Sequence, residues 1–180
     1  QPGEQVLGLD YRTKGDMLYA LGSSNRLYTV DVDSGAATAV GGPFAGVLQG
    51  SDYGFDFNPT VDRIRVVSDR GQNLRLHPDT GAVVDASADQ SGLQTDGPTA
   101  FAPTDRHAGQ PARVVAAAYS YNKADPKITT NFAIDAATGT LVTQGSREGL
   151  QPAVSPNSGR LFTVGPLGAG PFSDASFDIH

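Results

Sequence analysis

The stretch YGFDFNPTVDRIRVVSDRGQNLRLHPDTG, residues 53–81, combines strand-like alternation with many charged side chains. In the segment DRIRVVSD, alternation places Arg63 and Arg65 on one face of a strand and the apolar residues between them on the other face. In the following segment NLRLHPD, two leucines alternate with Arg75 and a histidine in the same way. We therefore expect neighbouring strands with one apolar face and one face that carries arginines.

The same pattern of short strands and tight turns continues on both sides of this stretch. The runs VLGLDYR, DMLYALGS, RLYTVDV and AATAVG are joined by the turn-forming segments TKG, SSN and DSG, which predicts a four-stranded antiparallel meander. YGFDFNP repeats LGLDYRT, and a looser third copy contains ARVVAAAYSY and TTNFAIDAATGTLVTQ. The turns DVDSG, HPDTG and DAATG, which end at Gly35, Gly81 and Gly139, mark the register of the repeat.

A repeat of about 40–50 residues with four strands in each unit is typical of β-propeller blades. The predicted fold is all-β and β-propeller-like, with about three four-stranded antiparallel meander blades plus a strand of a fourth, in one domain over residues 1–180. The expected repeats cover approximately residues 5–41, 52–86 and 97–145, followed by a partial repeat at 158–180, where ASFDIH matches GLDY and GFDF. Because closed propellers have at least four blades, we expect further blades from a longer chain, a second copy or a partner.

Composition excludes several classes of function. The 19 acidic and 13 basic residues give a net charge of −6, which disfavours binding to nucleic acid. The absence of cysteine excludes disulfides, thiolate metal ligands and cysteine nucleophiles. No apolar run is long enough to predict a transmembrane segment. The sequence begins at Gln1 without an initiator methionine, so we expect a processed or truncated chain, for which removal of a secretory signal peptide is one cause.

Longer motifs extend over nearly the whole chain. They include LYALGS, GFDFNPTVDRIRVVSD, GQNLRL, IDAATGTLV, VGPLG and FDI. With these motifs the chain resembles the bacterial domain of unknown function 4394 family, although YRTKG lacks the proline usual after the arginine and PTDRHAGQ replaces a more regular segment. The resemblance implies propeller-like repeats in an extracytoplasmic protein (secreted, periplasmic or cell-surface), and it implies no catalytic residue.

The clustered charges of the central stretch have two interpretations. Buried arginine requires bidentate carboxylate partners, and the stretch supplies them, so we favour an ion-pair lattice that holds strands together. The alternative is a site for an anion or a carbohydrate, lined by Arg65 and Arg75. The candidate ligand-binding residues are Arg63, Arg65, Arg75, Asp56, Asp69 and Tyr121.

Metal sites have weaker support. DVDSG resembles the start of a calcium loop, but the distal bidentate glutamate does not follow, so turn capping is favoured over calcium. His77, His107 and His180 show no metal-binding spacing. Histidines near strand ends in a cysteine-free extracytoplasmic protein still permit a copper site assembled from distant positions.

Three functions therefore remain open. We favour a binding or structural module of the cell envelope, which docks on a larger assembly or completes a ring with a protein partner or as a homo-oligomer. The first alternative is a copper-dependent oxidoreductase with superoxide dismutase-like or related oxidative chemistry. The second alternative is a glycan-binding propeller that uses Arg65 and Tyr121. The favoured function is not enzymatic and needs no cofactor.

Overall fold

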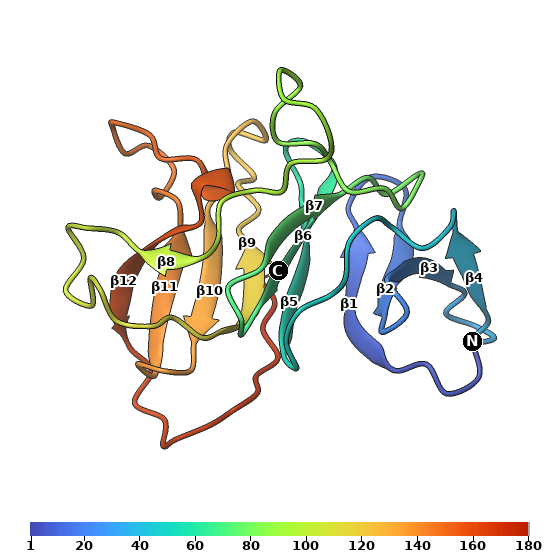
Figure 1. Ribbon diagram of the computed structural model, residues 1–180, viewed down its shortest axis with the longest axis horizontal. Helices are drawn as coiled ribbons and strands as arrows, with labels where there is room; N and C mark the ends of the chain where they lie inside the picture. Colours follow the sequence, from blue (N-terminus) through green and yellow to red (C-terminus); the bar gives the residue numbers. More distant parts are fainter. Residues whose placement is uncertain (180) are drawn as a thin grey trace.

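The computed structural model describes residues 1–179, and His180 lies outside the described residues. Within residues 1–179 the fold is all-β: twelve strands form three sheets, none of them closed into a barrel, and the one helical element is the short 3-10 turn η1 (Pro156–Ser158). Strands β1, β5 and β9, each at one edge of its sheet and called the first strands below, lie side by side where the sheets meet (Figure 1). No helix in this part of the chain is long and apolar enough to cross a membrane.

The first sheet is the predicted four-stranded meander, in the order β1-β2-β3-β4 with antiparallel pairing throughout. Its strands are β1 (Val6–Arg12), β2 (Met17–Gly22), β3 (Arg26–Val30) and β4 (Ala37–Val40). The turn after β3 closes as expected, because the Asp31 carboxylate accepts hydrogen bonds from Ser34 and Gly35 adopts φ 72°.

The second sheet contains the central stretch, in the order β5-β6-β7. Its strands are β5 (Tyr53–Asn58), β6 (Arg63–Ser68) and β7 (Asn73–Leu76). The predicted faces are confirmed, since Arg65 lies opposite Arg75 in the antiparallel register. The expected fourth strand is reduced to a single bridge between Leu76 and Val83, because the polar segment that follows lacks the alternation of a strand.

The third sheet differs most from the predicted repeat. Its order is β8-β12-β11-β10-β9, with strands β8 (Ala100–Phe101), β9 (Val114–Tyr119), β10 (Asn131–Asp135), β11 (Thr140–Gln144) and β12 (Arg160–Pro166). The segment 97–103 was expected to open the third repeat, but β8 pairs parallel with β12 at the edge remote from β9. Pro98 and Pro103 flank this two-residue strand and limit it, because proline cannot donate to a sheet.

The expected partial fourth repeat at 158–180 forms no separate sheet in its described part, residues 158–179. Strand β12 pairs antiparallel with β11 and so belongs to the third sheet. The residues from 167 to 179 contain no strand. Instead, Phe172 and Phe177 pack against Val115 and Ile134, so this segment covers the outer face of the third sheet.

The main apolar core lies between the first and second sheets. Tyr19, Leu21 and Leu27 of the first sheet pack against the apolar face of the second sheet. That face presents Phe55, Phe57, Ile64, Val66, Leu74 and Leu76. The arginine-bearing face of the second sheet points the other way, toward the third sheet, where Arg65 contacts Tyr119. The second sheet therefore separates an apolar interface from a polar one.

The close packing of β1, β5 and β9 depends on one glycine in β1 and one in β5. A Cβ atom on Gly8 would lie 2.4 Å from Cβ of Phe55, and one on Gly54 would lie 2.6 Å from the backbone nitrogen of Ala117. Both distances are below van der Waals contact, and the second neighbour is backbone that cannot rotate away. The glycines of the motifs LGLD and YGFD therefore allow β1 to approach β5 and β5 to approach β9.

We therefore predict that Gly54→Ala destabilises the protein by about 1–3 kcal/mol through overpacking between β5 and β9. Gly42→Ala is the matched control, because a Cβ atom there meets nothing within 4 Å and the backbone φ is not in the left-handed region. Urea denaturation of both variants measures the difference. Equal stability of the two variants would contradict this account of the packing.

Candidate functional site

Arg65 is the centre of a buried polar layer between the second and third sheets. Its side chain is 2% exposed, and Asp96 accepts a hydrogen bond from its Nη1. Nη1 also donates to Oδ1 of Asn73 at 2.9 Å, Nε to the Tyr119 hydroxyl at 3.2 Å, and Nη2 to Oδ1 of Asn157 at 2.7 Å. Each nitrogen of this guanidinium therefore has a partner.

The same buried carboxylate binds a second arginine. Arg75 donates from Nε and Nη2 to the two oxygens of Asp96, each at 2.8 Å, in a bidentate pair. The ion-pair lattice expected for the central stretch is thus seen in the structure, but its carboxylate, Asp96, lies outside residues 53–81 and was not expected. One carboxylate faces two guanidinium groups, which leaves a positive charge in excess.

Arg63 lies on the same strand face, two residues before Arg65 on β6. Its Nη1 donates to the backbone carbonyl of Asp62 at 2.8 Å, whereas the Asp62 carboxylate is held by Arg12 at 2.6–2.8 Å. The three predicted arginines thus line one pocket, of about 400 Å³, together with Tyr119 and other residues.

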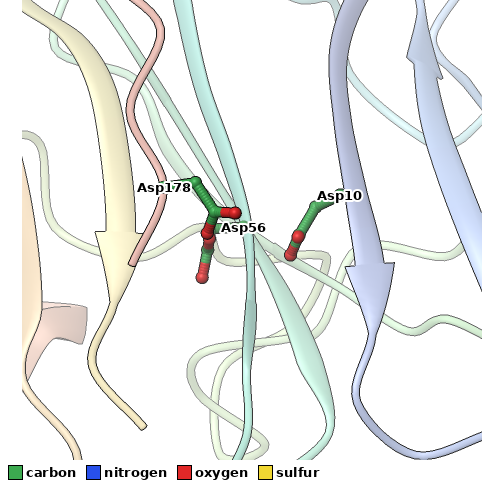
Figure 2. Close-up of side chains that lie close together, drawn as sticks. All are labelled: Asp10, Asp56 and Asp178. Carbon is green, nitrogen blue, oxygen red and sulfur yellow. The ribbon is translucent and has the colours of Figure 1, made fainter. Parts of the chain in front are cut away.

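Three aspartates form a second cluster, beside the strands β1 and β5 (Figure 2). Carboxylate oxygens of Asp10, Asp56 and Asp178 all lie within 4.8 Å of one another. Two of these carboxylates already serve backbone amides: Asp10 accepts from N–H of Phe57 at 2.7 Å, and Asp56 accepts from N–H of Tyr119 at 2.9 Å. Each of these bonds joins the first strand of one sheet to the first strand of the next.

Within this cluster, Asp56 holds a proton at neutral pH. Burial, reinforced by the charge of Asp10, raises the pKa of Asp56 to about 9, and burial likewise raises the pKa of Asp10 to about 6. Oxygen ligands of this kind suit hard cations such as Ca²⁺, which prefer six to eight of them. Because backbone amides occupy two of the three carboxylates and Asp56 stays protonated, the proton on Asp56 accounts for the cluster better than a cation.

The other candidate residues are dispersed. Oδ1 of Asp69 accepts from the backbone of Ser51 at 2.9 Å and so closes a turn, and Tyr121 is 50% exposed beyond the end of β9. Nδ1 of His77 accepts from the backbone of Asp79, and His107 packs on Phe101. Among the described residues, neither histidine joins a group of three potential metal ligands, and His180 lies outside them, so the copper hypothesis stays a prediction.

Sequence reasoning missed Asp96, Asn157, Asp10 and Asp178. The first two lie in irregular segments without alternation, where no sequence signal marked them. The two others were visible in the aligned motifs GLDY, GFDF and FDI, which place one aspartate at the same position of each copy. That alignment was a usable signal for the acidic cluster.

We predict that Arg65→Ala destabilises the protein by about 3–5 kcal/mol, because truncation leaves Asp96 buried with incomplete neutralisation. Arg70→Ala is the control, since this exposed arginine on the adjacent turn should change stability by no more than about 0.5 kcal/mol. Chemical denaturation of the two variants gives the comparison. A loss for Arg65→Ala as small as that for Arg70→Ala would contradict the structural role of the layer.

A second prediction concerns pH. Because the pKa of Asp56 is higher in the folded than in the unfolded chain, the folded state binds the extra proton, and the stability this proton confers is lost as pH rises toward about 9. Between pH 5 and 8, the free energy of unfolding should fall relative to Asp56→Asn by at most about 1.4 kcal/mol per pH unit. The amide oxygen introduced by Asp56→Asn would still accept from Tyr119, so parallel pH profiles in urea denaturation would refute the raised pKa.

Comparison with protein families agrees with the resemblance noted in the motifs. The family model described as a domain of unknown function (DUF4394) matches residues 1–180, the whole of this sequence. No curated protein matches the chain. On the extent of that match, the chain belongs to the DUF4394 family.

Proposed function

We propose that this chain is a propeller-like binding module that docks onto a partner protein through the outer face of its first sheet. The observation that carries the proposal is the apolar composition of that face. It is called the free face below and consists of Leu9, Tyr11, Leu18, Tyr28, Val30, Ala37 and Ala39, which surround the buried Ala20. The proposal includes the extracytoplasmic location that the family resemblance implies, and it assigns no catalysis.

The free face follows from the register of the first sheet. Leu9, Ala20, Tyr28 and Ala39 are aligned in one row across the four strands, and Tyr11, Leu18, Val30 and Ala37 form a second row. Between the two rows, Tyr19 points the other way, into the core. Leu9 is 55% exposed and Tyr11 is 46% exposed. A hollow of about 630 Å³ lies beside Tyr11. Contiguous apolar patches of this kind mark interaction sites in soluble proteins.

The hydrogen bonds between first strands support a β-sheet as the occupant. Phe57 and Tyr119 each donate their backbone N–H to an aspartate of the preceding sheet. Tyr11 follows Asp10 as Phe57 follows Asp56, yet its N–H reaches only the carboxylate of Asp10, its own neighbour, at 2.7 Å. A docked sheet with an aspartate on its first strand would give Tyr11 the bond between sheets that Phe57 and Tyr119 already make.

The partner is therefore a protein that presents a further sheet of this repeat type, and its arrival would extend the series of blades. The outer face of the third sheet is less suited to such docking, since Phe172 and Phe177 already cover it. The proposal thus commits to one face and to one kind of occupant.

Photo-crosslinking tests the proposal. With p-benzoylphenylalanine in place of Tyr11, we expect a crosslink in cells to a single protein, through a peptide from a β-strand that contains aspartate. The same probe at Val47, which is 70% exposed on a loop away from the free face, is the control. Leu9→Lys should weaken the purified complex at least tenfold, or about 1.4 kcal/mol.

Three results would contradict the proposal. Equal crosslinking from positions 11 and 47 would show that exposure alone directs the reaction. A crosslink from position 11 only to a second copy of this chain would replace the partner protein by self-association. Unchanged affinity of the complex for Leu9→Lys would place the interface elsewhere.

A further inference from the structure

The pocket of about 400 Å³ beside the buried polar layer has an unusual charge balance. Its polar lining consists mainly of Arg63, Arg65, Arg75, Asn58, Tyr119 and Asn157. Within residues 1–179, no acidic side chain lines it. Asp96 neutralises one of the two arginines that it binds, and Arg63 contacts only backbone carbonyls. A protein of net charge −6 thus keeps an excess of positive charge at this place.

The hydrogen-bonding groups left in the pocket are donors. Oδ1 of Asn157 already accepts from Arg65, and Oδ1 of Asn58 accepts from both the backbone and the hydroxyl of Thr60. The Tyr119 oxygen accepts from Nε of Arg65 and keeps its own hydrogen to donate. Ser155 Oγ likewise accepts, from the backbone of Asn157, and keeps its hydrogen to donate. What remains are the two asparagine NH₂ groups, the tyrosine and serine O–H groups and the free N–H groups of Arg63 and Arg75.

A pocket with free donors and excess positive charge matches an acceptor-rich anion. We propose that it binds a carboxylate, sulfate or phosphate group carried on a small polar molecule, and that the class of ligand is an acidic sugar such as a uronic acid. The volume exceeds that of a single inorganic ion and falls within the range of small-molecule sites. Val61 and Val84 in the lining provide apolar contact for a sugar ring.

The layer behind the pocket prepares it for this ligand. Four hydrogen bonds fix the guanidinium of Arg65 before any ligand arrives, and a bidentate pair fixes Arg75. Side chains that are already ordered lose little entropy on binding. Because Arg65 is 2% exposed, its charge is also screened less by solvent than that of a surface arginine.

Isothermal titration calorimetry with glucuronate and glucose tests this site, since the two sugars differ in the carboxylate. We expect saturable binding of glucuronate and none of glucose. Asn157→Asp keeps an oxygen that accepts from Arg65 but replaces the NH₂ donor with negative charge, so it should lower glucuronate affinity at least tenfold without loss of thermal stability. Arg63→Gln should also weaken binding, whereas Arg70→Gln, with the same change of charge outside the pocket, should not.

Several outcomes would overturn the inference. These are equal binding of glucose and glucuronate, unchanged affinity in Asn157→Asp, or no saturation by glucuronate below about 10 mM. Binding of inorganic sulfate but not of glucuronate would reject the acidic sugar. Leu9→Lys lies on the free face and should leave glucuronate binding unchanged, so this inference and the docking proposal can fail separately.

Discussion

The buried ion pair between Arg65 and Asp96 constrains the rest of the structure. A guanidinium that is 2% exposed would cost several kcal/mol unless its N–H groups found partners. Those partners come from four separate segments: the loop at Asp96, strand β7 with Asn73, strand β9 with Tyr119, and η1 with Asn157. Satisfying one side chain therefore fixes how the third sheet and two irregular segments lie against the second sheet.

This constraint gives the two inter-sheet boundaries different chemistry. Between the first and second sheets, aromatic and aliphatic side chains form a continuous apolar core. Between the second and third sheets, the polar layer around Arg65 takes much of the space, and the apolar contacts centre on Val67 and its neighbours. One element is common to both boundaries, namely the aspartate of one first strand that binds an amide of the next: Asp10 to Phe57, and Asp56 to Tyr119.

Local pattern predicted those features that depend on alternation or on turn chemistry. The faces of β6 and β7 followed from the spacing of Arg65 and Arg75, and the first sheet followed from its turns. Asp96 could not be assigned, because its place beside Arg65 depends on how a long irregular segment returns across the sheet. The parallel pairing of β8 was equally hidden, since a strand of two residues carries no periodicity. Contacts between residues far apart in the sequence, and not local propensity, decide both features.

The separation of charge in the second sheet links the acidic cluster to the arginine pocket. Asp56 and Arg65 are directly opposite in the register of β5 and β6, where they could form an ion pair. Instead, Asp56 binds the amide of Tyr119, and Arg65 is satisfied by Asp96. Had Asp56 neutralised Arg65, its pKa would be lowered, and Asp96 would leave no charge in excess. Because the two remain apart, Asp56 retains a proton where the first strands meet, and the arginine pocket retains the positive charge that an anion requires.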